Sequence, residues 1–278
     1  MLNKVLFIMK ERNVPYLNML IEDLEEKGID IFYTFEYNDL NSGDDTYIIT
    51  DCEDGIELAR NYNIGYIAYF PDEYNELPCP DAQCVFRGFD ELTADFVIKM
   101  YERFMGIPWT ILETERCIVR EMSLKDIDEL YELYDQPGIT DYIPGLCKYR
   151  EEEVEFERAY IKLMYEFCGY GIWNIIDKES GKIIGRAGIA NRDGFDDPEI
   201  GYLVGKDYQN RGIAKEVVSA IIKYGRSMLG FSRFNAFVHD ENIPSIKLIT
   251  GLGFKKVGYE IIEKSKLGHY VLLTSVRN

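Results

Sequence analysis

The chain has 278 residues, enough for two domains of ordinary size, and its formal charge is −18. The acidity is concentrated in residues 1–113, which hold 23 Asp and Glu against 8 Lys and Arg. Nucleic acids and anionic membranes are bound through clusters of Lys and Arg, so this balance argues against both as partners. No stretch approaches the ~18 apolar residues of a membrane span, and Lys4, Lys10 and Glu11 interrupt the apolar start. We therefore expect no signal peptide and a cytoplasmic protein.

The cysteines are scattered at positions 52, 79, 84, 117, 147 and 168, without the spacing of a disulfide framework or a zinc site. Cys79 and Cys84 are the closest pair, and no second pair or pair of histidines accompanies them. We expect reduced thiols and no metal.

Residues 1–113 read as alternating strands and helices. Apolar runs predict strands at 5–9, 29–35, 46–50, 64–70 and 83–87, and helix-like segments lie at 16–26, 53–62 and 91–105. Such alternation favours a parallel sheet covered by helices on both faces, so we predict a small Rossmann-like parallel α/β domain. Gly106 and Pro108 end the last helix and mark the domain boundary.

The strand Thr46–Thr50, followed by Asp51 and Asp54, resembles part of the Rossmann-like core of the haloacid-dehalogenase superfamily. That family needs an aspartate nucleophile just after its first strand, whereas Lys10 and Glu11 stand there. The resemblance therefore implies a degenerate accessory domain. Asp51 and Asp54 remain candidates either for Mg²⁺ binding or for turn and N-cap roles.

Residues 114–278 begin with a strand expected at 115–121 and a capping-box-like helix start at Ser123, with the helix continuing to Tyr134. A second helix is expected at 151–167. Strands at 171–176 and 183–190 form a predicted hairpin with Gly181 in its turn.

The most informative stretch lies between the strand-like run Glu199–Val204 and a helix-like run at 215–227. The first N–H groups of a helix lack intrahelical partners and carry partial positive charge, so a diphosphate can bind there. Gly212 lets the backbone approach such a ligand. The candidate site comprises Gln209, Asn210, Arg211, Gly212, Ile213, Ala214 and Lys215. An ordinary turn before a helix is the alternative.

Downstream, Asn242 and Ser245 open a short helix that Gly253-Phe254 closes. Together with Gln209-x-x-Gly212-x-Ala214 after a strand, this pattern resembles the GNAT superfamily of acyl-CoA-dependent N-acyltransferases. More narrowly, it resembles the RimJ/RimL branch, which includes ribosomal-protein N-terminal acetyltransferases. The resemblance covers about residues 114–275. It implies a GNAT-fold mixed-sheet α/β domain that uses acetyl-CoA as co-substrate and needs no metal.

The implied reaction is attack by an amine on a thioester, which requires a base, donors for the oxyanion and a proton for the departing thiolate. In the family, the strand before the loop supplies backbone groups to the pantetheine and thioester, and here these residues are Tyr202, Leu203 and Val204. Glu199 begins that strand and is the candidate base. Asp196 and Asp197 are alternative candidates for the base. If Glu199 has no catalytic role, it is a solvent-exposed charge at the end of the strand.

Many GNAT enzymes carry a proton-donating tyrosine where this chain has Ile249, so the resemblance makes Ser245 the candidate acid instead. Asn242 is expected to contact CoA. Both residues can equally serve only the helix start. By the same resemblance, the loop 136–150, with Tyr142 and Tyr149, walls the acceptor pocket, unless these tyrosines are surface packing.

The sequence thus predicts a two-domain protein in which residues 114–278 transfer an acetyl group to a primary amine of a protein or small molecule. The amine attacks acetyl-CoA directly in a ternary complex. The acidic residues 1–113 either recruit a cationic acceptor or keep the protein soluble. The alternative function is a CoA-binding regulatory module with little turnover. The sequence identifies neither the acceptor nor the oligomeric state.

Overall fold

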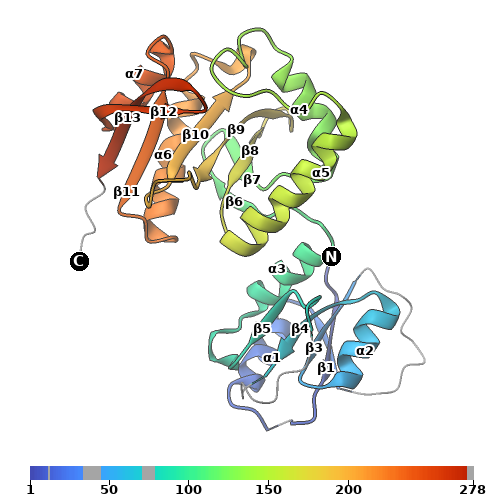
Figure 1. Cartoon of the computed structure of the whole chain (residues 1–278). Helices are drawn as coiled ribbons and strands as arrows, with labels where there is room; N and C mark the ends of the chain where they lie inside the picture. The colour runs from blue at the N-terminus through green and yellow to red at the C-terminus, as the bar shows by residue number, and fades with distance from the viewer. Residues whose placement is uncertain (12, 34–44, 71–78, 274–278) are drawn as a thin grey trace. The chain divides into compact units, whose positions relative to one another are not determined.

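The computed structural model describes residues 1–11, 13–33, 45–70 and 79–273, and the chain divides into two compact units, Met1–Trp109 and Thr110–Asn278 (Figure 1). The sequence-based boundary lay four residues later. The strand β6 (Thr110–Glu113) pairs with β7 (Cys117–Arg120) in the second sheet. No helix within the described ranges is long and apolar enough to cross a bilayer.

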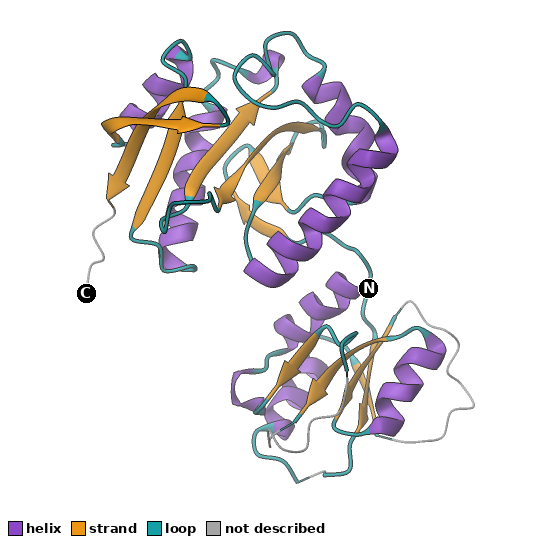
Figure 2. Cartoon of the chain, in the orientation of Figure 1, coloured by secondary structure: helices purple, strands orange, loops and turns teal. Residues whose placement is uncertain are grey.

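The first unit is a three-layer α/β structure (Figure 2). Its five parallel strands have the order β2-β1-β3-β4-β5. They are β1 Lys4–Ile8, β2 Asp30–Phe32, β3 Thr46–Thr50, β4 Gly65–Tyr69 and β5 Cys84–Phe86, and the helices are α1 Leu17–Glu26, α2 Glu53–Tyr62 and α3 Ala94–Phe104. Adjacent residues of a strand point to opposite faces, so Ile49 packs with α1 and α3 while Ile48 packs with α2. The predicted parallel α/β fold is confirmed.

Local details of this unit differ from the predictions. The strand predicted at 29–35 ends at Phe32, and Thr34 and Phe35 lie outside the described residues. Asp54 is not an N-cap, because Cys52 holds that position and Asp54 lies in the first turn of α2. Asp51 accepts hydrogen bonds from the N–H groups of Lys10 at 2.8 Å and Glu11 at 3.2 Å, so it holds the segment after β1 rather than a local turn.

The second unit is built on an eight-stranded mixed sheet with the order β12-β13-β11-β10-β9-β8-β7-β6. Besides β6 and β7, its strands are β8 Ile172–Asp177, β9 Ile183–Ala190, β10 Glu199–Val204, β11 Arg233–Val238, β12 Lys255–Ile262 and β13 Ser265–Leu273. The helices are α4 Ile127–Tyr134, α5 Arg150–Tyr160, α6 Ile213–Ser227 and α7 Ile243–Gly251. β10 and β11 are parallel, whereas the other strand pairs of this sheet are antiparallel in the described residues. The predicted mixed-sheet domain is confirmed.

Helices cover both faces of this sheet (Figure 1). On β9, the side chain of Arg186 reaches Glu157 of α5, with 3.0 Å between Nη1 and Oε1, and both groups are buried. Ile189 points to the other face, where a Cβ added to Gly225 of α6 would lie 2.8 Å from its Cδ1. The glycine therefore lets α6 pack closely against the strands that lead to the site.

The helix predicted at 151–167 is α-helical only as far as Tyr160, and the following residues, Ile161–Cys168, form wider π-helical turns. The end of α5 and these turns each place one tyrosine against the start of β8. Tyr160 accepts a hydrogen bond from the N–H of Ile172, and Tyr165 donates one to the carbonyl of Ile172. The hairpin of β8 and β9 and the capping box of Ser123 with Asp126 match the predictions.

Candidate active site

The candidate site lies where two neighbouring strands of the second sheet separate. β9 pairs with β10 along the whole length from Glu199 to Val204. On its other side, β10 pairs with β11 only at Glu199 and Asn235 in the described register. The rest of that edge of β10 is therefore open to a ligand.

The open edge presents the backbone groups of Tyr202 and Val204. Alternate residues of a strand direct their N–H and C=O groups to the same side. Gly205 donates to the carbonyl of Ile184 in β9 at 2.8 Å, so the odd-numbered residues face β9 and the even-numbered residues face the opening. In agreement, the carbonyl of Val204 accepts a hydrogen bond from the side chain of Gln209 at 2.9 Å. The N–H of Tyr202 consequently points into the opening.

A tight loop connects β10 to α6 through two residues with positive φ, Asn210 (58°) and Gly212 (80°). The first intrahelical hydrogen bond of α6 runs from the N–H of Glu216 to the carbonyl of Gly212 at 3.0 Å. The N–H groups before it, those of Ile213, Ala214 and Lys215, are the donors that a helix cannot satisfy internally. Together with the helix dipole, they form the arrangement that anion binding at a helix N-terminus requires.

Arg116, which the sequence analysis did not identify, stabilises this loop although it precedes Arg211 by 95 residues and Glu216 of α6 by 100. Its guanidinium donates to the carbonyl of Arg211 at 2.8 Å and to the Glu216 carboxylate at 2.6 and 2.8 Å. Burial raises the pKa of Glu216, but hydrogen bonds from Thr114 and Arg116 outweigh it and hold the pKa below its usual value. Arg116 thus offsets the one negative charge in the first turn of α6.

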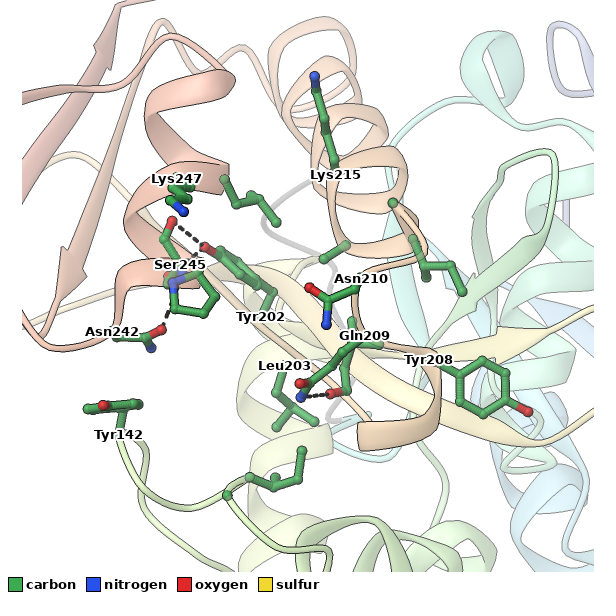
Figure 3. A pocket seen from close by; sticks show the side chains of 18 of the residues that line it. Tyr142, Tyr202, Leu203, Tyr208, Gln209, Asn210, Lys215, Asn242, Ser245 and Lys247 are labelled. Carbon is green, nitrogen blue, oxygen red and sulfur yellow. Dashed lines mark hydrogen bonds between the residues drawn. The ribbon is translucent and has the colours of Figure 1, made fainter.

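The opening and the loop belong to one cleft of about 610 Å³ (Figure 3). All but two of the predicted site residues line it: Tyr202, Leu203, Val204, Gln209, Asn210, Gly212, Ile213, Ala214, Lys215, Asn242 and Ser245. Lys215 and Lys247 add positive charge to the lining. The two exceptions are Glu199 and Arg211. The carbonyl of Arg211 accepts a hydrogen bond from Arg116, and the guanidinium of Arg211 lies 5.3 Å from the centre of the Tyr208 ring.

Three polar side chains meet where α7 borders the cleft (Figure 3). Asn242 caps α7 by accepting a hydrogen bond from the N–H of Ser245 at 3.2 Å. The hydroxyl of Tyr202 lies 2.6 Å from Oγ of Ser245. Burial raises the pKa of Tyr202 to about 12, so the hydroxyl is protonated at neutral pH. Asn242 and Ser245 therefore support the helix start and also line the cleft.

Glu199, the candidate base, forms an ion pair with Arg192, and its side chain is 13% exposed. Burial raises the pKa of Glu199 above its usual value, although the hydrogen bond and charge of Arg192 oppose the shift. Of the alternative bases, Asp197 pairs with Arg233 at 3.2 Å and Asp196 is exposed. Ile249, which stands where many GNAT enzymes carry a tyrosine, is fully buried in the core.

The loop between α4 and α5 contributes Gly138, Ile139, Tyr142 and Ile143 to the cleft. The hydroxyl of Tyr142 donates to the carbonyl of Glu241 at 3.3 Å, so it joins this loop to the segment before α7. Tyr149 is 55% exposed and does not line the cleft.

Comparisons with known proteins agree with this geometry. The family model described as "Acetyltransferase (GNAT) domain" matches residues 116–255. The chain is 35% identical over 151 residues to the "Uncharacterized N-acetyltransferase p20" of Bacillus licheniformis. This match covers 53% of this chain and 83% of the relative. It is 27% identical over 162 residues to the "[Ribosomal protein uS5]-alanine N-acetyltransferase" of Escherichia coli (strain K12), with 55% and 82% covered.

The solved structure of a ribosomal-protein-S5-alanine acetyltransferase from Vibrio fischeri has the same fold as the second unit. Its TM-score is 0.52 at 19% identity, and the match covers 59% of this chain and 96% of that chain. The family match begins after the first unit, and the haloacid-dehalogenase resemblance of that unit is not confirmed. The family model matches half of the chain, and β10 and β11 separate after Glu199 as described above. The chain therefore belongs to the GNAT acetyltransferase family and is an acyltransferase.

Proposed function

We propose that the second unit transfers an acetyl group from acetyl-CoA to a primary amine, which attacks the thioester directly in a ternary complex. The observation that carries this proposal is the shared cleft. It joins the free N–H groups at the start of α6 to the open edge of β10, where the N–H of Tyr202 faces the opening.

Each part of acetyl-CoA has a matching surface in this proposal. The diphosphate binds the N–H groups from Gly212 to Lys215, and the Lys215 ammonium adds charge. The pantetheine amides pair with the open edge of β10 as an added strand would. The acetyl oxygen accepts a hydrogen bond from the N–H of Tyr202, which stabilises the negative charge that this oxygen gains in the transition state.

The amine nitrogen forms a bond to the acetyl carbon, the carbon–sulfur bond breaks, and the electron pair goes to sulfur. The amine proton goes to Glu199 through water, because Glu199 does not line the cleft itself. Its raised pKa supports this role, since a more basic carboxylate accepts a proton more readily. Asp196, which is exposed, is the alternative acceptor of that proton.

Two observations support candidate acceptors. The name of the Escherichia coli relative specifies the alanine of a ribosomal protein, which supports testing a protein N-terminal amine. The acid-rich residues 1–113 support a cationic acceptor, because their negative field attracts it over a long range. We propose that this first unit performs no chemistry of its own and favours the approach of the acceptor.

The experiment is an acceptor screen with radiolabelled acetyl-CoA and simultaneous measurement of thiol release. The panel contains a peptide beginning with alanine, free amino acids, spermidine and an aminoglycoside. We expect label transfer and equal thiol release with at least one amine. Tight CoA binding without transfer to any of them would contradict the proposal. It would favour the CoA-binding regulatory module, which is consistent with Ile249 at the usual tyrosine position.

A further inference from the structure

Two hydroxyl groups from different parts of the chain touch within the cleft. Tyr202 lies on β10 and Ser245 lies in the first turn of α7, and both line the cleft. The Tyr202 oxygen is 2.6 Å from Oγ of Ser245 and 3.3 Å from the Ser245 carbonyl oxygen. Figure 3 shows the tyrosine side chain extending from its strand to the serine.

We propose that Tyr202 is a positioning residue that holds Ser245 so that the Ser245 hydroxyl donates a hydrogen bond to the departing sulfur of CoA. This inference rests on the proposed function. It assigns the stabilisation of the leaving thiolate to a pair of side chains, in a chain where Ile249 can supply no proton.

The position of the pair follows from the backbone of the same residue. In the proposed complex, the N–H of Tyr202 binds the acetyl oxygen. Sulfur and oxygen are bonded to the same carbon atom of a thioester, so the sulfur lies close to Tyr202 as well. The hydroxyl pair that Tyr202 forms with Ser245 borders the same cleft.

The tyrosine hydroxyl can donate to the Ser245 carbonyl at 3.3 Å or to Oγ at 2.6 Å, and the proposal uses the shorter contact, to Oγ. Burial raises the pKa of Tyr202 to about 12, so its hydroxyl keeps its proton at neutral pH and can donate to Oγ of Ser245. A serine hydroxyl carries one hydrogen and can accept as well as donate. When Tyr202 donates to Oγ, the hydrogen of Ser245 is free to point at the sulfur. Asn242 fixes the serine backbone through the bond from the N–H of Ser245.

The step balances without a further reactant. The new carbon–nitrogen bond forms, the carbon–sulfur bond breaks, and sulfur leaves with the electron pair as a thiolate. The hydrogen bond from Ser245 stabilises that charge, and the thiolate takes a proton from water as CoA is released. The other two tyrosines of the lining are less suited. Tyr142 is bonded to the carbonyl of Glu241, and Tyr208 directly precedes the phosphate-binding loop.

The test is the pKa of the CoA thiol in the complex of the full chain with CoA. It is obtained from the ultraviolet absorption of the thiolate, with the same protein bound to desulfo-CoA as the blank. A hydrogen bond to the charged form lowers a pKa. We expect the wild-type complex to hold the pKa of the thiol below that of free CoA titrated in the same buffer. Tyr202→Phe should raise the thiol pKa by about one unit, and Ser245→Ala should raise it at least as far.

Tyr170→Phe is the matched control, because Tyr170 also makes a 2.6 Å hydrogen bond, to Asn191, outside the cleft lining. It should leave the thiol pKa unchanged. If Tyr202→Phe does not fold, Tyr202→Leu, which also removes the hydroxyl, takes its place in the same titration. A thiol pKa equal to that of the wild type in Ser245→Ala, or in a folded Tyr202→Phe, overturns the inference.

Kinetics separate this inference from the proposed function. With an acceptor that the screen identifies, Tyr202→Phe should lower kcat about tenfold and leave the affinity for CoA within a few fold. A wild-type protein that transfers no acetyl group refutes the proposed function, whereas the thiol titration still decides the role of the hydroxyl pair. A wild-type protein that transfers acetyl groups, together with an unchanged kcat in Tyr202→Phe, refutes only the inference.

Discussion

The two ends of the cleft are formed by different kinds of groups, backbone N–H groups at one end and side chains from separate segments at the other. The proposed phosphate end consists of backbone N–H groups from consecutive residues, Gly212 to Lys215, presented by one loop and one helix. The proposed thioester end combines the backbone of β10 with side chains from separate segments, Tyr202 and Ser245, and with the more distant ion pair of Glu199 and Arg192. A site made of local backbone tolerates most changes of side chain, whereas a site made of distant side chains depends on each of them.

Arg186→Met tests the stability of the sheet that carries both ends of the cleft. Arg186 of β9 lies opposite Leu203 of β10 in that sheet. Removing the arginine leaves Glu157 buried and unpaired, so we expect the free energy of unfolding to fall by about 3–5 kcal/mol. Urea denaturation followed by Trp173 fluorescence in a Trp109→Phe background measures the second unit alone, since the chain has 2 tryptophans.

The pH dependence of that loss has a definite sign. Burial already raises the pKa of Glu157, and the Arg186 charge opposes this shift, so removing Arg186 raises the pKa further. A carboxyl whose folded-state pKa is raised loses stability as pH rises through it. The variant should therefore be nearest to the wild type below pH of about 4.3, the ordinary pKa of Glu, and fall behind above it. The double variant Glu157→Leu/Arg186→Met should recover most of the loss; no recovery would mean that Arg186 acts through packing alone.

Glu199→Gln acts on the thioester end only. It keeps the size of the side chain and removes its basicity, so we expect kcat to fall by on the order of 100-fold while CoA affinity is retained. The wild-type rate should rise with pH through a pKa above the usual glutamate value, because burial raises the pKa of Glu199. This limb should vanish in the variant. Asp196→Asn is the control, and a pH profile that changes only there would transfer the role of base to Asp196.

Arg116→Met acts on the phosphate end only. It frees the Glu216 carboxylate beside the diphosphate and removes the donor to the carbonyl of Arg211. We expect CoA affinity to fall about fivefold at low salt, because the pair is partly exposed and screened, and kcat to stay unchanged. Calorimetric titration measures the affinity. Adding Glu216→Gln should restore part of it, and a failure to do so would show that the Arg211 contact alone matters.

The smallest effect concerns the first unit. Replacing the exposed residues Glu22, Glu25, Glu26 and Glu57 with Gln removes four negative charges without touching a described ion pair. If this unit attracts a cationic acceptor, kcat/KM for spermidine should fall about two- to threefold at low ionic strength and match the wild type at 1 M salt. The association rate of anionic CoA should change in the opposite direction. Equal kcat/KM at every ionic strength would leave the first unit without a steering role.

The sequence predicted what is local. The loop from Gln209 to Lys215 and the cap at Asn242 could be predicted because each is formed by residues within one turn. The Arg116–Glu216 pair spans 100 positions and the Tyr202–Ser245 pair spans 43, so neither appears in any window of the sequence. Alternation along β10 does place Tyr202 on the face opposite Leu203, but only the tertiary fold shows that this face meets α7.

The same reasoning explains the structural elements that were missed. β12 reads Lys-Lys-Val-Gly-Tyr-Glu-Ile-Ile, and its glycine and charged residues weaken the strand pattern. It lies at the edge of the sheet, where Val257, Tyr259 and Ile261 are exposed. The π-helical turns after Tyr160 are fixed by the contacts of Tyr160 and Tyr165 with Ile172, which periodicity in the sequence cannot reveal.

A comparison of acetyl-CoA with a truncated form of the same ligand tests whether the start of α6 binds the diphosphate of CoA. Gly212→Glu places a negative charge at the start of the helix, and Gly212→Gln is its control because both replacements carry the same strain at a φ of 80°. Calorimetry compares acetyl-CoA with S-acetylpantetheine, which lacks the diphosphate. If the diphosphate binds there, the wild type and Gly212→Gln should prefer acetyl-CoA, the wild type by about 100-fold or more, and Gly212→Glu should bind both ligands equally weakly. A Gly212→Glu protein that keeps the full preference for acetyl-CoA would contradict diphosphate binding at this position.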